Sequence, residues 1–141
     1  MNLVIDASVL IKAYVPENLS DKADDLFDDV EKDEIILLAP DLIYPETGNI
    51  LWKKHRLKEL TISEVKKISE EIISLPIKIE PSIFLIQLAI DIGISRNITV
   101  YDAIYISLAA IYKTKLITAD KRLVDAISVG TFRKHVEWLG K

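Results

Sequence analysis

Near the start of the sequence lies the stretch Asn2-Leu3-Val4-Ile5-Asp6-Ala7-Ser8, in which an apolar run from Asn2 ends in an acid, Asp6. The run is too short for a helix and rich in aliphatic residues, which indicates a buried strand. Similar runs occur at Ile35–Ala39 and Leu116–Thr118, with a weaker one at Ile77–Glu80 and a closing edge strand expected at Val136–Leu139. The sequence therefore predicts several short strands.

Helical patterns separate these runs. Apolar residues recur at helical spacing between Leu19 and Val30, and aspartates fill the opposite face. Thr61 and Glu64 form a capping-box pattern that opens another helix. Further helices are expected from Leu42 to about Lys58, Ser82 to about Arg96 and Val100 to about Lys113; the last two are nearly apolar throughout, so we expect them to lie between other elements.

Strands that alternate with helices favour right-handed crossovers and a parallel sheet covered on both faces. We therefore expect a three-layer α/β/α sandwich with a mainly parallel central sheet. The sequence has 141 residues and no linker-like or repeated segment, so residues 1–141 are expected to form a single domain.

Composition excludes several classes of protein. Cysteine is absent, which rules out disulfides, thiolate zinc sites and cysteine nucleophiles and fits a cytoplasmic location. The longest uncharged runs, Pro81 to Ile90 and Ala103 to Tyr112, are too short to span a membrane. The net charge of -4 argues against binding nucleic acid by bulk electrostatics, so such a partner would need local basic patches or metal ions.

Four acids stand out by position. Asp6 ends the first predicted strand and Asp120 follows a late one, so both reach one crevice if those strands are neighbours. Glu46 and Asp102 lie in apolar surroundings, where a carboxylate is costly unless it is paired or bound to metal. Carboxylates about 5 Å apart repel by about 3 kcal/mol per pair at an effective dielectric near 20. An oxygen-only cluster would relieve this by binding a hard divalent ion such as Mg²⁺.

Each acid also has a purely structural interpretation. Asp6 and Asp120 can cap helices, and Asp102 can form a capping box with Thr99. Glu46 is harder to explain this way, because no basic residue stands three or four positions from it.

Together these segments resemble the PIN-domain nucleases, and within them the small VapC-type toxins of toxin–antitoxin pairs. The resemblance covers essentially the whole chain, and only Leu123 departs from it, where phenylalanine is more usual. It implies a cluster of acids that binds Mg²⁺ or Mn²⁺, endoribonuclease activity on RNA, a cognate antitoxin and a homodimer. The matching segments are the strand ending in Asp6 with Ser8 two residues on, Pro45 to Leu51 around Glu46, Tyr101 to Ala109 around Asp102, and Thr118 to Leu123 around Asp120.

The expected roles follow from the acid cluster and the resemblance. Asp6 and Asp102 are expected to bind the metal directly, Glu46 to bind it or orient water, and Asp120 to act as an outer ligand or bind a second ion. All four are the expected catalytic residues. The supporting residues are Ser8, Asn49 and Thr118 around the ligands and Lys121 and Arg122 as RNA contacts.

Other features leave alternatives open. The basic run from Lys53 to Lys58 is either an RNA contact or a solvated helix end. Trp52 and Trp138 are expected in the core or at an interface, and the apolar faces after Leu42 and Ile62 could supply a dimer contact.

Other enzyme signatures are missing. The sequence contains no phosphate-binding glycine loop and no serine-hydrolase elbow. A haloacid-dehalogenase-like phosphatase would need an acid at Ser8, and a receiver domain would need a better phosphoacceptor than Asp41. The main alternative is a non-catalytic PIN-like module that binds RNA or protein, and a metal titration separates it from the nuclease.

Overall fold

The computed structural model describes residues 1–141 and contains one five-stranded sheet with the order β3-β2-β1-β4-β5. Every neighbouring pair of strands is parallel, which confirms the predicted α/β/α sandwich. The predicted strand positions are confirmed to within about one residue at each end. The strands are β1 (Asn2–Ile5), β2 (Ile36–Pro40), β3 (Ile77–Glu80), β4 (Leu116–Thr118) and β5 (Val136–Trp138).

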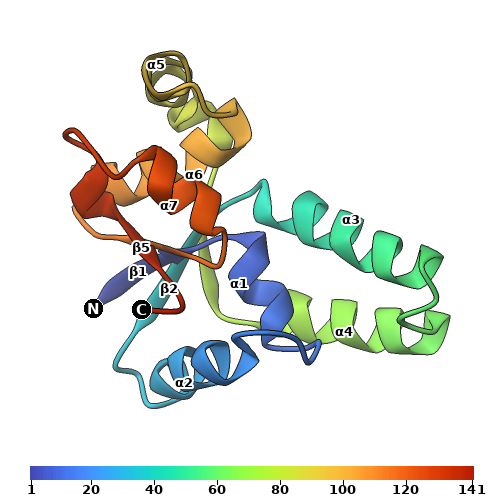
Figure 1. Ribbon diagram of the computed structural model, residues 1–141. Coiled ribbons are helices and arrows are strands. Elements are labelled where there is room, and N and C mark those ends of the chain that lie inside the picture. The colour runs from blue at the N-terminus through green and yellow to red at the C-terminus, as the bar shows by residue number, and fades with distance from the viewer.

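Seven α-helices and two short 3₁₀ turns join the strands. In chain order, β2 and β3 are added on one side of β1, and β4 and β5 are added on its other side. Because right-handed crossovers in opposite directions use opposite faces of a sheet, the helices before β3 cover one face and those after it cover the other. Figure 1 shows α1 to α4 on one side of the sheet and α5 to α7 on the other. The helices are α1 (Ala7–Lys12), α2 (Ser20–Glu31), α3 (Ile43–Arg56), α4 (Ile62–Ser74), α5 (Ile86–Arg96), α6 (Val100–Ile111) and α7 (Lys121–Ala126), with 3₁₀ turns η1 (Ser82–Phe84) and η2 (Arg133–His135).

Helix α4 starts where the sequence predicts. Thr61 Oγ1 accepts the Glu64 amide at 3.1 Å, and the Glu64 side chain accepts the Thr61 amide at 3.0 Å. These two bonds satisfy amides that the first turn of a helix leaves free, so the predicted capping box is confirmed.

Helix α6 is the central helix of its layer. Residues 103–109 are all buried, and the helix packs against β1, β2 and β4, as its apolar sequence predicts. The matching expectation for Ser82 to Arg96 is wrong. Helix α5 packs on the outside of α6, so Ile94 is 79% exposed and Phe84 of η1 is 71% exposed.

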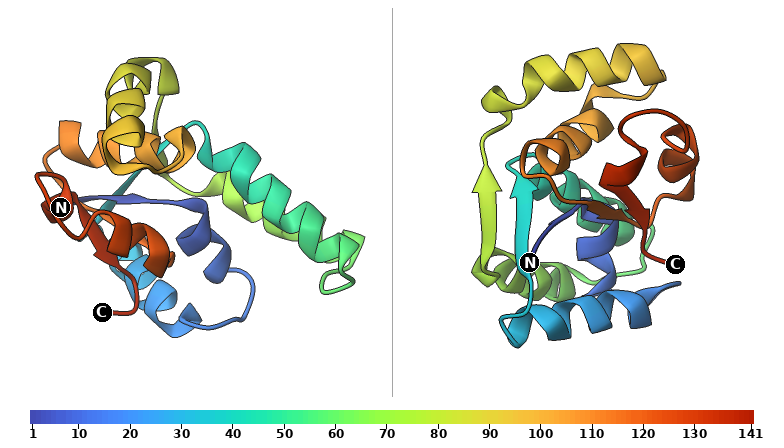
Figure 2. Two further views of the ribbon diagram at one scale, coloured as in Figure 1. Left: turned by 45° about the horizontal axis from the view of Figure 1, so that its top comes forward. Right: turned by 90° about the vertical axis from the view of Figure 1, so that its left-hand side faces the viewer.

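The register of the sheet brings two predicted site residues together. Val4 pairs with Leu116 and Ile5 with Ile117, so the residue after β1 lies beside Thr118 at the end of β4. Helices α3 and α4 form a hairpin whose far end projects away from the sheet (Figure 2). None of the helices combines the length and apolar character needed to cross a membrane.

Candidate active site

A cavity of about 470 Å³ opens at the carboxyl ends of β1 and β4. The structure brings all four acids into its lining, although they come from the ends of two strands and from helices α3 and α6. No lysine, arginine or histidine lines this cavity, so it concentrates negative charge. The polar lining residues are Asp6, Ser8, Glu46, Asn49, Tyr101, Asp102, Tyr105 and Asp120.

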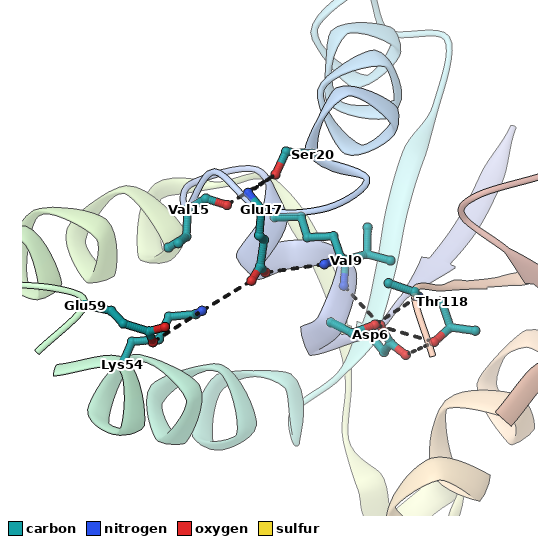
Figure 3. Close-up of polar contacts among 11 residues, drawn as sticks. Asp6, Val9, Val15, Glu17, Ser20, Lys54, Glu59 and Thr118 are labelled. Atoms are coloured by element: carbon teal, nitrogen blue, oxygen red, sulfur yellow. Dashed lines mark hydrogen bonds and ion pairs between the residues drawn. The ribbon is translucent and has the colours of Figure 1, made fainter. Parts of the chain in front are cut away.

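Asp6 is the most buried of the four acids, with 8% of its surface exposed. Its Oδ1 accepts the Ser8 hydroxyl at 2.5 Å and the Val9 amide at 3.2 Å, and its Oδ2 accepts the Thr118 hydroxyl at 2.5 Å (Figure 3). Burial raises the pKa of Asp6 to about 6, even though these hydrogen bonds favour the ionised form. Asp6 therefore caps α1 and also presents a carboxyl group that resists ionisation.

The two hydroxyls on Asp6 also fix the turn that carries Asp120. Ser8 Oγ accepts the Ala119 amide at 3.0 Å, and Thr118 Oγ1 accepts the Asp120 amide at 3.1 Å. This network ties the end of β1 to the end of β4. Asn49 lines the same cavity, but no hydrogen bond joins it to the acids.

Glu46 has a partner that was not predicted from the sequence. The Tyr105 hydroxyl donates to Glu46 Oε1 at 2.6 Å, and the Tyr105 side chain is almost fully buried in α6. Burial raises the pKa of Glu46, the hydrogen bond from Tyr105 opposes the rise, and the charge of Asp102 adds to it. The sequence does contain a clue to this partner. Tyr105 stands three residues after Asp102 and therefore lies on the same face of the predicted helix as that acid.

Asp102 and Asp120 sit at the starts of helices. The Asp102 amide donates to Thr99 Oγ1 at 3.1 Å, and Asp120 Oδ1 accepts the Arg122 amide at 3.0 Å. Burial raises the pKa of Asp102, Thr99 opposes the rise and the charge of Asp120 adds to it. The capping interpretation of Asp120 is thus correct, and it leaves the second carboxyl oxygen available.

The donor set fits a hard divalent ion. The carboxylates raise one another's pKa, no side-chain cation offsets them, and all the donors are oxygen atoms. As placed, no three acids surround one point closely enough to hold an ion. Binding would therefore require side-chain rotation. Asp120 is exposed and free to rotate, whereas Glu46 would first have to release the hydrogen bond from Tyr105.

The fold and the cavity define a class of protein: a parallel α/β/α sandwich with a carboxylate site at its strand ends. Residues 3–127 match the PIN domain, which is most of the chain. The protein belongs to the PIN domain family.

Similarity in sequence and in fold to known proteins extends over most of the chain. Ribonuclease VapC3 of Pyrobaculum aerophilum is 32% identical over 127 residues, which are 89% of this chain and 94% of that protein. The crystal structure of PAE2754 from Pyrobaculum aerophilum has a TM-score of 0.68 at 25% identity and covers 89% of this chain and 79% of its own. VapBC2 from Rickettsia felis, solved with a DNA fragment from its promoter, has a TM-score of 0.64 at 12% identity and covers 98% of both chains.

We expect Tyr105→Phe to raise the pKa of Glu46 further, because the hydroxyl that favours the ionised carboxylate is lost. The measurement is a pH titration of the Glu46 side-chain carboxyl carbon by NMR. Tyr112→Phe is the matched control, since the Tyr112 hydroxyl donates to Glu80 at 3.1 Å, outside the acid-lined cavity. An unchanged Glu46 pKa in Tyr105→Phe would show that this hydrogen bond does not tune the carboxylate.

Proposed function

We propose that the protein is a metal-dependent endoribonuclease that hydrolyses RNA phosphodiester bonds, acting as the VapC-type toxin of a toxin–antitoxin pair. The observation that carries the proposal is the cavity in which four acids meet without a cation. The 32% identity to a protein named ribonuclease VapC3 supports the same conclusion.

In this proposal Asp6 and Asp102 would hold Mg²⁺ or Mn²⁺ directly, Glu46 would either join them or orient a water molecule, and Asp120 would be an outer ligand or bind a second ion. The bound ion would supply positive charge for the reacting phosphodiester and make a nearby water more acidic. Ionised Glu46 can then accept the proton of the attacking water. Ser8 and Thr118 orient Asp6 through hydrogen bonds, and Asn49 lines the same cavity.

The partners and the extent of the domain belong to the same proposal. An antitoxin partner is supported by the resemblance to VapC-type toxins, and we infer that the pair acts in the cytoplasm. Residues 1–141 are inferred to be a single PIN-like domain, because the edge strand β5 lies beyond the matched residues 3–127 yet pairs with β4.

We also infer a homodimer, but at a different face from the one the sequence suggested. The exposed apolar side chains are most closely spaced on η1 and α5, where Phe84, Ile90 and Ile94 are 71%, 41% and 79% exposed; those after Leu42 and Ile62, such as Trp52 and Ile73, are spread more widely. An exposed apolar patch of this kind is typical of a protein–protein contact.

The double variant Ile90→Lys/Ile94→Lys is expected to be monomeric. Burying two lysine charges in a small apolar contact costs more desolvation free energy than the contact contributes to association. Sedimentation velocity measures the change. Ile73→Lys on α4 is the matched control, because Ile73 is also exposed, at 74%, but lies outside the α5 patch. A dimer that survives the double variant would place the contact elsewhere.

The function itself is tested by incubating a panel of structured RNAs with the protein and Mg²⁺, Mn²⁺ or excess chelator. The proposal expects internal cleavage with either metal and none with chelator. Metal-independent RNA binding without cleavage would instead support the non-catalytic PIN-like module.

A further inference from the structure

A second cavity, of about 990 Å³, lies between the edge strand β5 and helix α7. Its charge is opposite to that of the acid-lined cavity. Five cationic side chains line it against two acidic ones, in a chain whose net charge is -4. The charged lining residues are Lys115, Lys121, Arg133, Lys134 and Lys141 with Asp125 and Glu137.

The two acids in this basic cavity do not neutralise it. Lys115 and Lys141 share Glu137, at 3.5 and 3.6 Å, and Lys121 lies 3.9 Å from Asp125. The remaining two cations, on η2, form no ion pair. The cavity therefore keeps a positive charge available for an anionic ligand.

The two cavities share no lining residue, but consecutive residues border them. Asp120 lines the acid-lined cavity and Lys121 lines the basic one. Thr118, which holds Asp6, pairs with Trp138 of β5, and the ring of Trp138 lies 4.7 Å from the Lys121 ammonium. The Lys121 side of the basic cavity therefore lies next to the Asp120 edge of the acid-lined one.

We propose that the basic cavity between β5 and α7 holds the phosphodiester backbone of the RNA strand whose scissile phosphate enters the acid-lined cavity. This inference rests on the proposed function. A cavity whose charged lining residues are all acids repels a polyanion, so the substrate needs a neighbouring surface that supplies cations. Phosphate contacts by Lys and Arg meet that need.

The other basic groups are less suited to this role. Lys12 and Lys54 are engaged by Glu17, at 3.4 and 3.3 Å (Figure 3). The basic end of α3 lies about 15 Å beyond Glu46, at 1.5 Å per residue, on the hairpin that projects away from the sheet (Figure 2). Arg122 lines a third cavity, which shares Ser8 and Asp120 with the acid-lined one but whose two lysines are those engaged by Glu17. Lys121 and Arg122 are the two RNA contacts expected from the sequence. Of these, only Lys121 lines the basic cavity and is part of the proposal.

The first test compares Arg133→Ala/Lys134→Ala with the control Lys66→Ala/Lys67→Ala on α4, which removes the same charge from an exposed helix face. Binding of a single-stranded RNA oligonucleotide is measured against salt with Mg²⁺ present, in a Glu46→Gln background that prevents cleavage. Each lost phosphate contact lowers the slope of log K against log salt by about 0.7, so the cavity variant should lose about 1.4. Between 50 and 200 mM salt its affinity should then fall about sevenfold less than that of the control.

A second readout locates the RNA. In Trp52→Phe the only indole is Trp138, which lines the basic cavity, so bound RNA should change its fluorescence. In Trp138→Phe the only indole is Trp52, 54% exposed on α3, and its emission should stay constant. A response of Trp52 instead of Trp138 would place the RNA at the basic end of α3 and overturn the proposal.

The outcomes separate this inference from the proposed function. Hydrolysis of a small phosphodiester such as bis(p-nitrophenyl) phosphate should be equal in wild type and Arg133→Ala/Lys134→Ala, because it needs only the acid-lined cavity.

If wild type cleaves RNA but the salt slope is the same in both double variants, the inference fails and the function stands. If RNA binding depends on the cavity but no RNA is cleaved, the function fails instead. If the cavity variant loses binding of poly-aspartate but not of RNA, the cavity serves an acidic protein segment and the inference is wrong.

Discussion

Asp102→Asn is expected to reduce RNA cleavage by more than about 100-fold. Altering an outer partner of a metal ligand costs about 10- to 100-fold in activity, and loss of a direct ligand should cost more. Asn keeps the size of the side chain, and the Asp102 amide that bonds to Thr99 remains in place, so the fold should be unaffected. The measurement is the single-turnover cleavage rate in Mg²⁺. Glu46→Gln and Asp6→Asn should behave in the same way.

Asp91→Asn is the matched control, because Asp91 is an exposed acid on α5 that does not line the acid-lined cavity. It should cleave at the wild-type rate. Near wild-type cleavage by Asp102→Asn, Glu46→Gln and Asp6→Asn would show that these acids take no part in the reaction and have structural roles only.

The metal-free protein should lose stability as the pH rises from about 4 to about 6. Folding raises the pKa of Asp6 from 3.8 to about 6, so in this range the folded state binds more protons than the unfolded state. The free energy of unfolding therefore falls as the pH rises, by about 3 kcal/mol for Asp6 at 1.36 kcal/mol per pH unit. Glu46 and Asp102, whose pKa values are also raised, act in the same direction. Urea unfolding at a series of pH values measures the slope.

Asp6→Asn should flatten this slope and be more stable than wild type at pH 7, because Asn caps a helix about as well as Asp and carries no charge. Added Mg²⁺ should stabilise wild type, by about 2.7 kcal/mol at a hundredfold excess over Kd, and the variant much less. Asp91→Asn should follow the wild-type slope. Identical slopes in Asp6→Asn and wild type would show that Asp6 ionises normally when the protein folds.

The sheet and most helices could be predicted from the sequence because each is locally encoded. The run at Leu116–Thr118 begins with two aliphatic residues after Lys115 and is followed within two positions by Asp120, and the Thr61–Glu64 pair marks a helix start with its own hydrogen bonds. The expectation for α5 failed for a related reason. An apolar segment indicates burial, but nothing in it distinguishes a core from a surface that another chain covers, and Ile94 is on the outside.

The positions of the four acids could also be read from the sequence, since each follows a strand or interrupts an apolar helix. The contacts between them could not. The Tyr105–Glu46 bond joins residues 59 positions apart, and the Thr118–Asp6 bond joins residues 112 apart. Both depend on how α6 and β4 pack in three dimensions. Apart from Lys121, the basic cavity was missed because its cations are scattered from Lys115 to Lys141, and only Arg133 and Lys134 are adjacent in the sequence.

The most direct test of the metal centre is to measure the rate of RNA cleavage as a function of the amount of Mn²⁺ bound to the protein. The EPR signal of free Mn²⁺ gives the bound amount by difference from the total. We expect binding at the acid-lined cavity, cleavage that rises in proportion to occupancy, and loss of both when Asp102 is replaced by Asn. Full cleavage with no bound metal, or Mn²⁺ binding that is unchanged in Asp102→Asn, would contradict the claim that these acids form the metal centre of a nuclease.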